Sequence, residues 1–166
     1  MTSVTDEELA ERFRELVSYD PASGQLRWKV QIPGQAGIGS LAGSYHSTGR
    51  VYIKLDRKRY MAHRVIWLMM TGRWPRFIDH IDHCPTNNQW ANLRECSQAE
   101  NQRNVPVRKD SSTKIRGVFP LKNGRYYSRI RVDGKRIHLG TFATKELAAA
   151  AYAGAARELH GEFACL

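Results

Sequence analysis

Three side chains between residues 77 and 104 could together hydrolyse a phosphodiester: Asp79, His80 and Asn101. Hydrolysis needs a base that takes a proton from water and a cation that stabilises the leaving alkoxide. An imidazole suits the first task near neutral pH. A carboxylate and a carboxamide oxygen suit a hard divalent ion, which keeps several waters and takes further ligands from the substrate's phosphate. These residues therefore predict a nuclease site with one divalent metal ion, Mg²⁺ first and Mn²⁺ as the alternative.

The chain around these residues must bring them to one place. Apolar neighbours frame Asp79-His80 and predict a short strand, and the Pro and paired Asn of residues 83–89 predict a loop. Residues 90–94 predict a second extended segment. Ser97, with Glu100 three residues later, predicts a capping box at the start of a helix that carries Asn101. Because neighbours on a regular strand point to opposite faces, we expect the first strand to bend or bulge at Asp79-His80.

This order of strand, loop, strand and helix resembles the HNH endonucleases of the ββα-metal type. The resemblance is carried by Asp79-His80-Ile81-Asp82, Asn92-Leu93-Arg94 and residues 100–104, ENQRN. It is closest to the phage and intron-encoded homing enzymes whose third motif letter is Asn. The resemblance implies that His80 is the general base, that Asp79 and Asn101 hold the metal, and that Asn92 braces the loop by holding backbone groups. The sequence differs from this subgroup at His83-Cys84, where a Gly-rich turn is usual.

Other interpretations of the same residues stay open on the sequence alone. Asp-His pairs are commonly buried hydrogen-bonded couples, and Asn-rich loops commonly only turn the chain. The protein would then be a non-catalytic DNA-binding transcriptional regulator that keeps the HNH fold as a scaffold. RNA binding through a C-terminal sheet is a third hypothesis.

Composition and charge favour a folded protein with a polyanionic partner. The 166 residues are 42% hydrophobic, and the net charge is +10 with a pI near 9.9. Residues 1–18 carry −3, residues 19–105 carry +6 and residues 106–166 carry +7, so the basic charge lies in the middle and C-terminal parts. We therefore expect double-stranded DNA as the partner, with no membrane and no obligate protein partner.

The cysteines and the N-terminal residues bear on the compartment. Cys84, Cys96 and Cys165 form no C-x-x-C pair, so they predict no structural zinc site. No stretch approaches the roughly 20 apolar residues of a spanning helix. The polar, acidic start is not a signal peptide. We expect a cytoplasmic protein that is not secreted, acting in the host cytoplasm if phage-encoded.

Residues 1–76 predict a helix, a hairpin region and a second helix. Thr5 and Glu8 form a capping box that starts an amphipathic helix at 5–18. Strand and turn patterns follow over residues 25–60, and a buried helix follows at 61–71. Basic side chains at residues 50–59, Lys54 among them, could follow a DNA backbone or form an ordinary solvated edge. On the second helix, we expect Arg64 to contact DNA and His63 to be structural or a phosphate contact.

Residues 115–161 predict three antiparallel strands and a helix. Asn123-Gly124 and Asp133-Gly134 are hairpin turns that divide strands at 115–121, 125–132 and 135–139. Thr144 caps a helix at about 145–160. Period two puts Tyr126, Ser128, Ile130 and Val132 on one face of the middle strand, and Ile137 and Leu139 inward on the third. The opposite face carries Arg125, Tyr127, Arg129, Arg131, Arg136 and His138, an exposed basic surface that predicts an anionic partner.

The C-terminal segment resembles the ethylene-response-factor (APETALA-two) DNA-binding domain. The likeness is carried by residues 115–118 (IRGV), 134–142 (GKRIHLGTF) and 148–164. It implies DNA contacts by Arg116, Arg131 and Arg136, while Arg129 and His138 occupy contacting positions with a different residue type. A three-stranded sheet can read the major groove, with Arg bidentate to guanine.

The whole chain is expected to be an α+β protein of two domains. Residues 1–104 would form an HNH nuclease domain with its ββα-metal core at 77–104, residues 105–114 a linker, and residues 115–166 the DNA-binding sheet and helix. In the nuclease domain, Arg103 joins the expected DNA contacts. The favoured function is a metal-dependent, homing-type DNA endonuclease, encoded by a phage or mobile element, that nicks its target.

Overall fold

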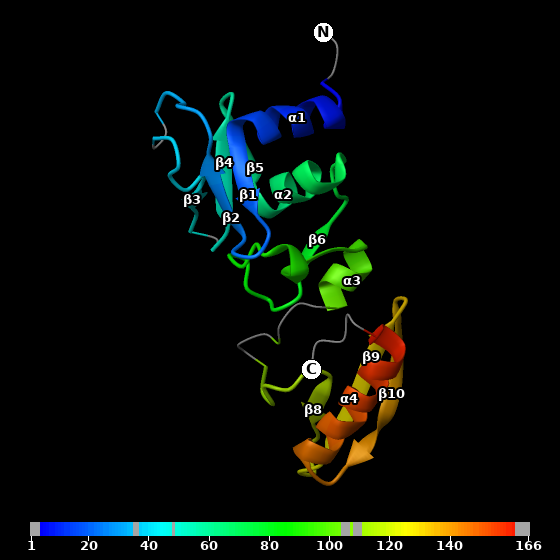
Figure 1. Cartoon of the computed structure of the whole chain (residues 1–166). Helices are drawn as coiled ribbons and strands as arrows, with labels where there is room; N and C mark the ends of the chain where they lie inside the picture. The colour runs from blue at the N-terminus through cyan, green and yellow to red at the C-terminus, as the bar shows by residue number, and fades with distance from the viewer. Residues whose placement is uncertain (1–3, 35–36, 48, 104–106, 108–110, 162–166) are drawn as a thin grey trace. The chain divides into compact units, whose positions relative to one another are not determined.

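The computed structural model describes residues 4–34, 37–47, 49–103, 107 and 111–161. It divides into two compact units, Met1–Cys96 and Ser97–Leu166. Figure 1 shows both units. Half of the expected linker, residues 105–106 and 108–110, and the end of the expected C-terminal match, residues 162–164, lie outside the described residues.

The first unit begins with a helix and a hairpin. Helix α1 (Asp6–Leu16) has the predicted capping box at Thr5 and ends two residues earlier than expected. It ends there because the next residues form strand β1 (Val17–Asp20), which pairs antiparallel with β2 (Gln25–Trp28). The turn between these strands is closed by Asp20, whose carboxylate accepts from the backbone N–H of Ala22 at 3.0 Å.

A second sheet and helix α2 complete the body of this unit. The sheet has the order β3 (Ser44–Tyr45), β4 (Val51–Leu55) and β5 (Lys58–Met61). Its β4–β5 turn is tighter than predicted, because Asp56 and Arg57 both adopt left-handed φ values of 49° and 64° and β5 already starts at Lys58. Helix α2 (Ala62–Thr71) ends at Gly72 as predicted.

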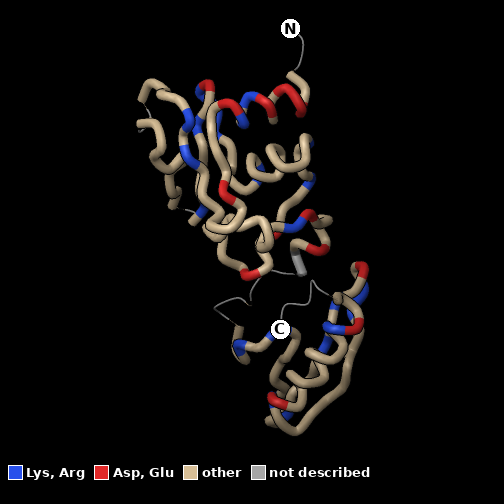
Figure 2. The backbone as a smooth tube through the Cα atoms, viewed as in Figure 1, with Lys and Arg blue, Asp and Glu red and all other residues tan. Residues whose placement is uncertain are grey.

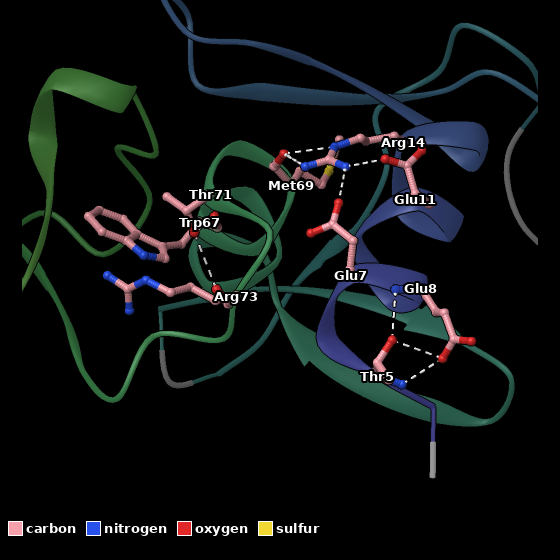
Figure 3. A network of polar contacts seen from close by, with 9 residues as sticks. All are labelled: Thr5, Glu7, Glu8, Glu11, Arg14, Trp67, Met69, Thr71 and Arg73. Atoms are coloured by element: carbon pink, nitrogen blue, oxygen red, sulfur yellow. Dashed lines mark hydrogen bonds and ion pairs between the residues drawn. The ribbon is translucent and has the colours of Figure 1, made fainter. Parts of the chain in front are cut away.

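The core of the first unit lies between α1, α2 and the strands. Phe13, Ile53, Val65, Ile66 and Leu68 are at most 1% exposed. Figure 3 shows how α1 is fastened to the last turn of α2: the Arg14 guanidinium donates to the carbonyl oxygen of Met69 at 2.9 and 2.6 Å and pairs with Glu7 at 3.0 Å. This contact satisfies a carbonyl near the helix end that has no partner within its own helix.

Two short strands end the first unit. Strand β6 (Ile78–His80) pairs antiparallel with β7 (Leu93–Glu95). The prediction of one extended segment at 90–94 is wrong in its first half, where Trp90–Asn92 forms the 3₁₀ turn η1. This turn lets the loop close locally, with the Asn92 N–H donating to the Gln89 carbonyl at 2.9 Å.

The second unit contains the short helix α3 (Gln98–Arg103) and a three-stranded sheet covered by one helix. Ser97 and Glu100 form the predicted capping box of α3. The sheet has the order β8 (Val118–Pro120), β9 (Tyr126–Val132) and β10 (Lys135–Phe142), and helix α4 (Lys145–His160) packs on all three strands.

Two details of this sheet differ from the prediction. Strand β8 starts three residues late, because Gly117 adopts a left-handed φ of 68° and lies so close to α4 that a Cβ would meet the Tyr152 ring at 2.1 Å. Strand β10 is longer than predicted and has a register shift between His138 and Gly140. Ile137 faces Ile130 across the strands as expected, yet it stays 41% exposed because β10 is an edge strand.

Candidate active site

Asp79 lies in the middle of β6, directly opposite Arg94 on β7. The Arg94 guanidinium donates to Asp79 Oδ2 from Nε at 3.0 Å and from Nη2 at 2.8 Å. Both side chains are almost buried, 11% exposed for Arg94 and 8% for Asp79. The predicted metal-binding carboxylate is therefore held in a fixed orientation by a cation that the sequence analysis did not single out.

His80 is the last residue of β6, and its ring packs between a loop and helix α2. Its Nε2 lies 3.2 Å from the carboxamide oxygen of Asn88. The His63 ring of α2 stands edge-on to it, with the ring centroids 5.0 Å apart. Burial lowers the pKa of His80, although the hydrogen bond with Asn88 and the charges of Asp82 and Asp79 act in the other direction. A lowered pKa keeps the imidazole neutral near pH 7, the form in which it can accept a proton.

The expected bulge at Asp79-His80 is absent from the described β6–β7 ladder, whose register is regular from Ile78 to His80. Asp79 contacts Arg94, whereas His80 contacts Asn88 and His63. The two neighbouring side chains thus have separate partners, as the alternation of a regular strand requires.

Asn92 ties the two ends of the loop that joins the strands. Its carboxamide oxygen accepts from the Asp82 N–H at 3.0 Å, and its nitrogen donates to Asp82 Oδ1 at 2.9 Å and to the Asn87 carbonyl at 2.8 Å. Burial alone would raise the pKa of Asp82, but the hydrogen bonds from Asn87, Cys84 and Asn92 lower it overall. Asp82 is therefore an anionic anchor for this loop.

His83 occupies the place where the homing subgroup usually has a Gly-rich turn. It adopts a left-handed φ of 61°, and its N–H donates to the His80 carbonyl at 3.0 Å. Histidine tolerates this conformation better than most residues with a side chain. The turn thus forms without glycine.

His63 and Arg64 on α2 are engaged inside the first unit. His63 is 6% exposed, and burial, followed by the positive charges of His80, Arg50 and Arg64, lowers its pKa to about 3. Arg64 donates to the Pro75 carbonyl at 2.8 Å, and its guanidinium lies 5.6 Å from the Trp74 ring centroid. Of the two expectations for His63, these surroundings favour the structural one; for Arg64 they describe contacts within the protein.

Lys54 lies on an exposed basic hairpin of the first unit. It stands directly opposite Arg59 in the β4–β5 ladder, and both side chains are exposed. Figure 2 shows Lys and Arg along the strands of this unit and Asp and Glu gathered on α1. Like charges directly opposite one another are destabilising unless an anion lies near them.

The remaining residues of the predicted site lie on α3, in the second unit. Asn101 is partly buried there, and its N–H donates to the Ser97 carbonyl at 3.0 Å. Its place in a metal site with Asp79 stays a prediction. The side chain of Arg103 lies outside the described residues.

The second unit presents its expected basic face opposite α4. Burial alternates along β9, where Ser128 and Ile130 are buried and Arg131 is exposed. Arg131 and Arg136 stand directly opposite each other, as do Arg129 and His138. Arg116 and Arg131 line one pocket of about 400 Å³, and Arg125 is exposed at the start of β9.

An aromatic row crosses the same face. The Phe119 and Tyr127 rings are stacked with centroids 5.0 Å apart, and Tyr127 lies 6.0 Å from the His138 ring. The guanidinium of Arg129 lies 4.4 Å from the Phe119 ring centroid. Such a contact orders an arginine at the surface, so Arg129 is presented in a defined position.

The oxygen donors predicted for a divalent ion are few, Asp79 in the first unit and Asn101 in the second. Among the described residues there is no cluster of three or more His, Cys, Asp or Glu side chains that could hold a metal. A Mg²⁺ ion of the kind found in nucleotide-processing sites needs only one or two protein oxygens beside substrate phosphate. In the prediction, Asp79 supplies one of these oxygens and Asn101 the second.

Sequence reasoning missed two residues that the structure places beside the predicted ones. Arg94 was quoted only as part of a motif, although its position opposite Asp79 follows once the two strands pair in register. Asn88 was taken for a loop former, and only the folded loop brings its side chain to His80. No sequence signal distinguishes Asn88 from its neighbour Asn87.

Comparison with known proteins places this site in a known family. A family model described as HNH endonuclease matches residues 60–103, which include α2, both strands and α3. An uncharacterized HNH endonuclease, L560, of Acanthamoeba polyphaga mimivirus is 32% identical over 115 residues, covering 68% of this chain and 59% of that protein. Protein 3.8 of Escherichia phage T7 is 30% identical over 105 residues, covering 61% of this chain and 86% of that protein. No solved structure matches the chain.

In the described part of the chain, no helix has the length and apolar character needed to cross a bilayer.

Proposed function

The chain contains an HNH endonuclease domain, and on that premise we propose that it is a metal-dependent DNA endonuclease of the homing type that nicks duplex DNA. The proposal assigns His80 as the general base, Asp79 and Asn101 as metal ligands, and Asn92 as the brace of the active-site loop. Residues 1–104 would form the nuclease domain, and residues 115–166 would bring it to its target.

The observation that carries the proposal is the placement of His80. The ring sits at the end of β6, half-buried, in contact with one carboxamide and one histidine ring. Its lowered pKa leaves it able to accept a proton at neutral pH. This is the environment that a general base requires, inside the segment matched by the family model.

The reaction would be an in-line hydrolysis. His80 takes a proton from a water molecule, whose oxygen forms a bond to phosphorus while the bond from phosphorus to the 3′ oxygen breaks. The products are a 5′ phosphate and a 3′ hydroxyl. A divalent ion held by Asp79 and Asn101 would supply charge neutralisation at the departing oxygen. Arg94 would keep the Asp79 carboxylate in place for that role.

The C-terminal sheet would deliver the DNA. Its exposed face carries Arg125, Arg129, Arg131 and Arg136 together with Tyr127 and His138. The directly opposed Arg131 and Arg136 repel each other unless an anion lies between them, and DNA phosphate is such an anion. In the first unit, Lys54 and Arg59 form a similar pair. We assign the phosphate and base contacts of the full chain to these surfaces and, as further predicted contacts, to Arg116, Arg64 and Arg103.

The decisive experiment compares His80→Ala with the parent protein in a plasmid-nicking assay with Mg²⁺, with and without EDTA. We expect the parent to nick and EDTA to stop it, and we expect the variant to bind DNA normally but to cut at least a hundredfold more slowly. His46→Ala, which removes an exposed histidine elsewhere in the first unit, should cut like the parent. A His80→Ala protein that cuts at the parental rate would rule out His80 as the base.

One observation favours a second candidate function, a non-catalytic DNA-binding regulator. Asp79 is already paired with Arg94, as a purely structural carboxylate would be. If the parent protein binds duplex DNA but nicks nothing in Mg²⁺ or Mn²⁺, the regulator is the better description.

A further inference from the structure

Asn88 is buried beside His80, the predicted base, and its carboxamide oxygen forms a hydrogen bond with the His80 ring. It is 5% exposed, and its carboxamide oxygen lies 3.2 Å from His80 Nε2. A carboxamide oxygen can only accept a hydrogen bond, so the imidazole donates from Nε2. The neutral ring then carries its proton on Nε2 and its basic lone pair on Nδ1. Asn88 thereby selects both the tautomer and the orientation of the ring.

The backbone of Asn88 is in turn held by a hairpin almost seventy residues earlier in the chain. The Tyr19 hydroxyl on β1 donates to the Asn88 carbonyl at 2.8 Å. Burial, followed by the charge of Asp20, raises the pKa of Tyr19 to about 12, so the hydroxyl stays protonated as a donor. The Trp90 N–H donates to the Pro21 carbonyl at 3.1 Å, which ties the end of the loop to the same hairpin.

Gly24 shows how closely the hairpin approaches this loop. It has a φ of 73°, and a Cβ at this position would lie 2.5 Å from the backbone carbon of Asn88 and from the nitrogen of Gln89. A side chain could fit there only if the loop moved. The β1–β2 turn and the backbone of residues 88–89 are therefore in direct contact.

We propose that Asn88 is a positioning residue that orients His80, and that the β1–β2 hairpin, through Tyr19 and Gly24, holds Asn88 in that place. The catalytic rate of this family member would then depend on an N-terminal hairpin outside the segment that the family model matches. The predicted effect on activity rests on the proposed role of His80 as the base. The predicted effect on the His80 ring does not.

Two substitutions at residue 88 separate positioning from simple packing. Asn88→Leu keeps the size but removes the acceptor, and Asn88→Asp keeps an oxygen acceptor of the same shape. We expect Asn88→Leu to lower kcat about 10–100-fold with little change in KM for DNA, as losing an outer-shell partner does in other sites. Asn88→Asp should recover most of the loss. Gln89→Leu, a change of similar size at the next and exposed residue, is the matched control and should keep the parental kcat.

Tyr19→Phe tests the hairpin. It removes one hydroxyl and leaves the ring, so we expect kcat to fall about two- to tenfold, the equivalent of one neutral hydrogen bond. Tyr45→Phe, at a tyrosine that is 76% exposed, is the matched control. Gly24→Ala should lower kcat more than Tyr19→Phe, because it displaces the loop itself.

The ring nitrogens of His80 give a readout that does not depend on activity. In ¹⁵N–¹H spectra of the full-length protein at neutral pH, we expect the Nε2–H tautomer in the parent and in Asn88→Asp, and a mixture of tautomers in Asn88→Leu. An unchanged tautomer in a folded Asn88→Leu protein, or a parental kcat in that protein, overturns the proposal. If Asn88→Leu does not fold, the other two variants decide. Loss of the Nε2–H tautomer in Asn88→Asp overturns the role of Asn88. Parental kcat and parental spectra in Tyr19→Phe overturn the role of the hairpin. If His80→Ala cuts normally, the proposed role of His80 as the base has failed, and the tautomer of the ring alone decides whether Asn88 orients His80.

Discussion

The two units carry similar antiparallel hairpins with opposite charge arrangements. In β6–β7, the directly opposed pair is Asp79 and Arg94, buried and of opposite charge. In β9–β10, it is Arg131 and Arg136, exposed and of the same charge. The first pair is neutralised within the protein, whereas like charges face each other in the second, an arrangement that a nearby anion would relieve. This difference separates a hairpin that holds a site together from one that is suited to binding.

The same contrast between buried and exposed groups applies to His63 on α2 and to His138 on β10. His63 is buried against His80, while His138 is exposed on β10 beside Tyr127. A buried histidine must stay neutral, so the first unit becomes sensitive to acid.

The largest expected effect comes from breaking the buried pair. Arg94→Leu leaves the Asp79 carboxylate buried without its guanidinium, and we expect the free energy of unfolding to fall by about 3–5 kcal/mol. Urea titration followed by fluorescence measures this. The control is Arg73→Leu. It removes the partner of Glu95, the neighbour of Arg94 on β7, from a more exposed ion pair, and the free energy of unfolding should fall much less. Equal losses in the two variants would show that burial does not distinguish the pairs.

The next effect is the acid sensitivity conferred by His63. Its pKa is about 3 in the folded protein and 6.5 when unperturbed, so between these values the unfolded chain binds a proton that the folded chain does not. Stability is therefore full above pH 6.5 and is lost as the pH falls, by about 3 kcal/mol between pH 7 and pH 4. Denaturant titrations at a series of pH values should show this slope, and His63→Gln should flatten it. A slope that is the same in both proteins would assign the acid sensitivity to other groups.

The smallest effect on stability comes from Arg136→Glu. This substitution gives β9–β10 an opposed pair of opposite charge, as in β6–β7. We expect the free energy of unfolding of the second unit to rise by less than about 1 kcal/mol. We also expect binding of duplex DNA to weaken and the dependence of this binding on salt to become less steep. Fluorescence anisotropy at several salt concentrations tests the binding, with Lys122→Glu in the β8–β9 turn as the control. DNA affinity that is unchanged in Arg136→Glu would remove this face from the proposed interface.

Local signals predicted most of the elements. Capping boxes at Thr5 and Ser97, the helix end at Gly72 and the turns at Asn123-Gly124 and Asp133-Gly134 all depend on residues close in sequence, and the structure shows each of them. Predictions failed where contacts from elsewhere decide the local form. Residues 90–92 form a 3₁₀ turn instead of a strand because Trp90 is tied to Pro21, and β8 starts late because Gly117 packs on Tyr152.

For the site, the sequence alone pointed to the residue types and their order: a carboxylate and an imidazole on one strand, and a carboxamide that closes the loop. The first two follow from the chemistry that each side chain can perform, which does not depend on the fold, whereas the role of the carboxamide, Asn92, was implied by the resemblance to the HNH endonucleases. Only the tertiary structure decided which partner each of them has, namely Arg94 for Asp79 and Asn88 for His80, with Tyr19 behind Asn88. Hydrogen bonds form between atoms about 3 Å apart, and a distance between residues 19 and 88 exists only once the chain has folded.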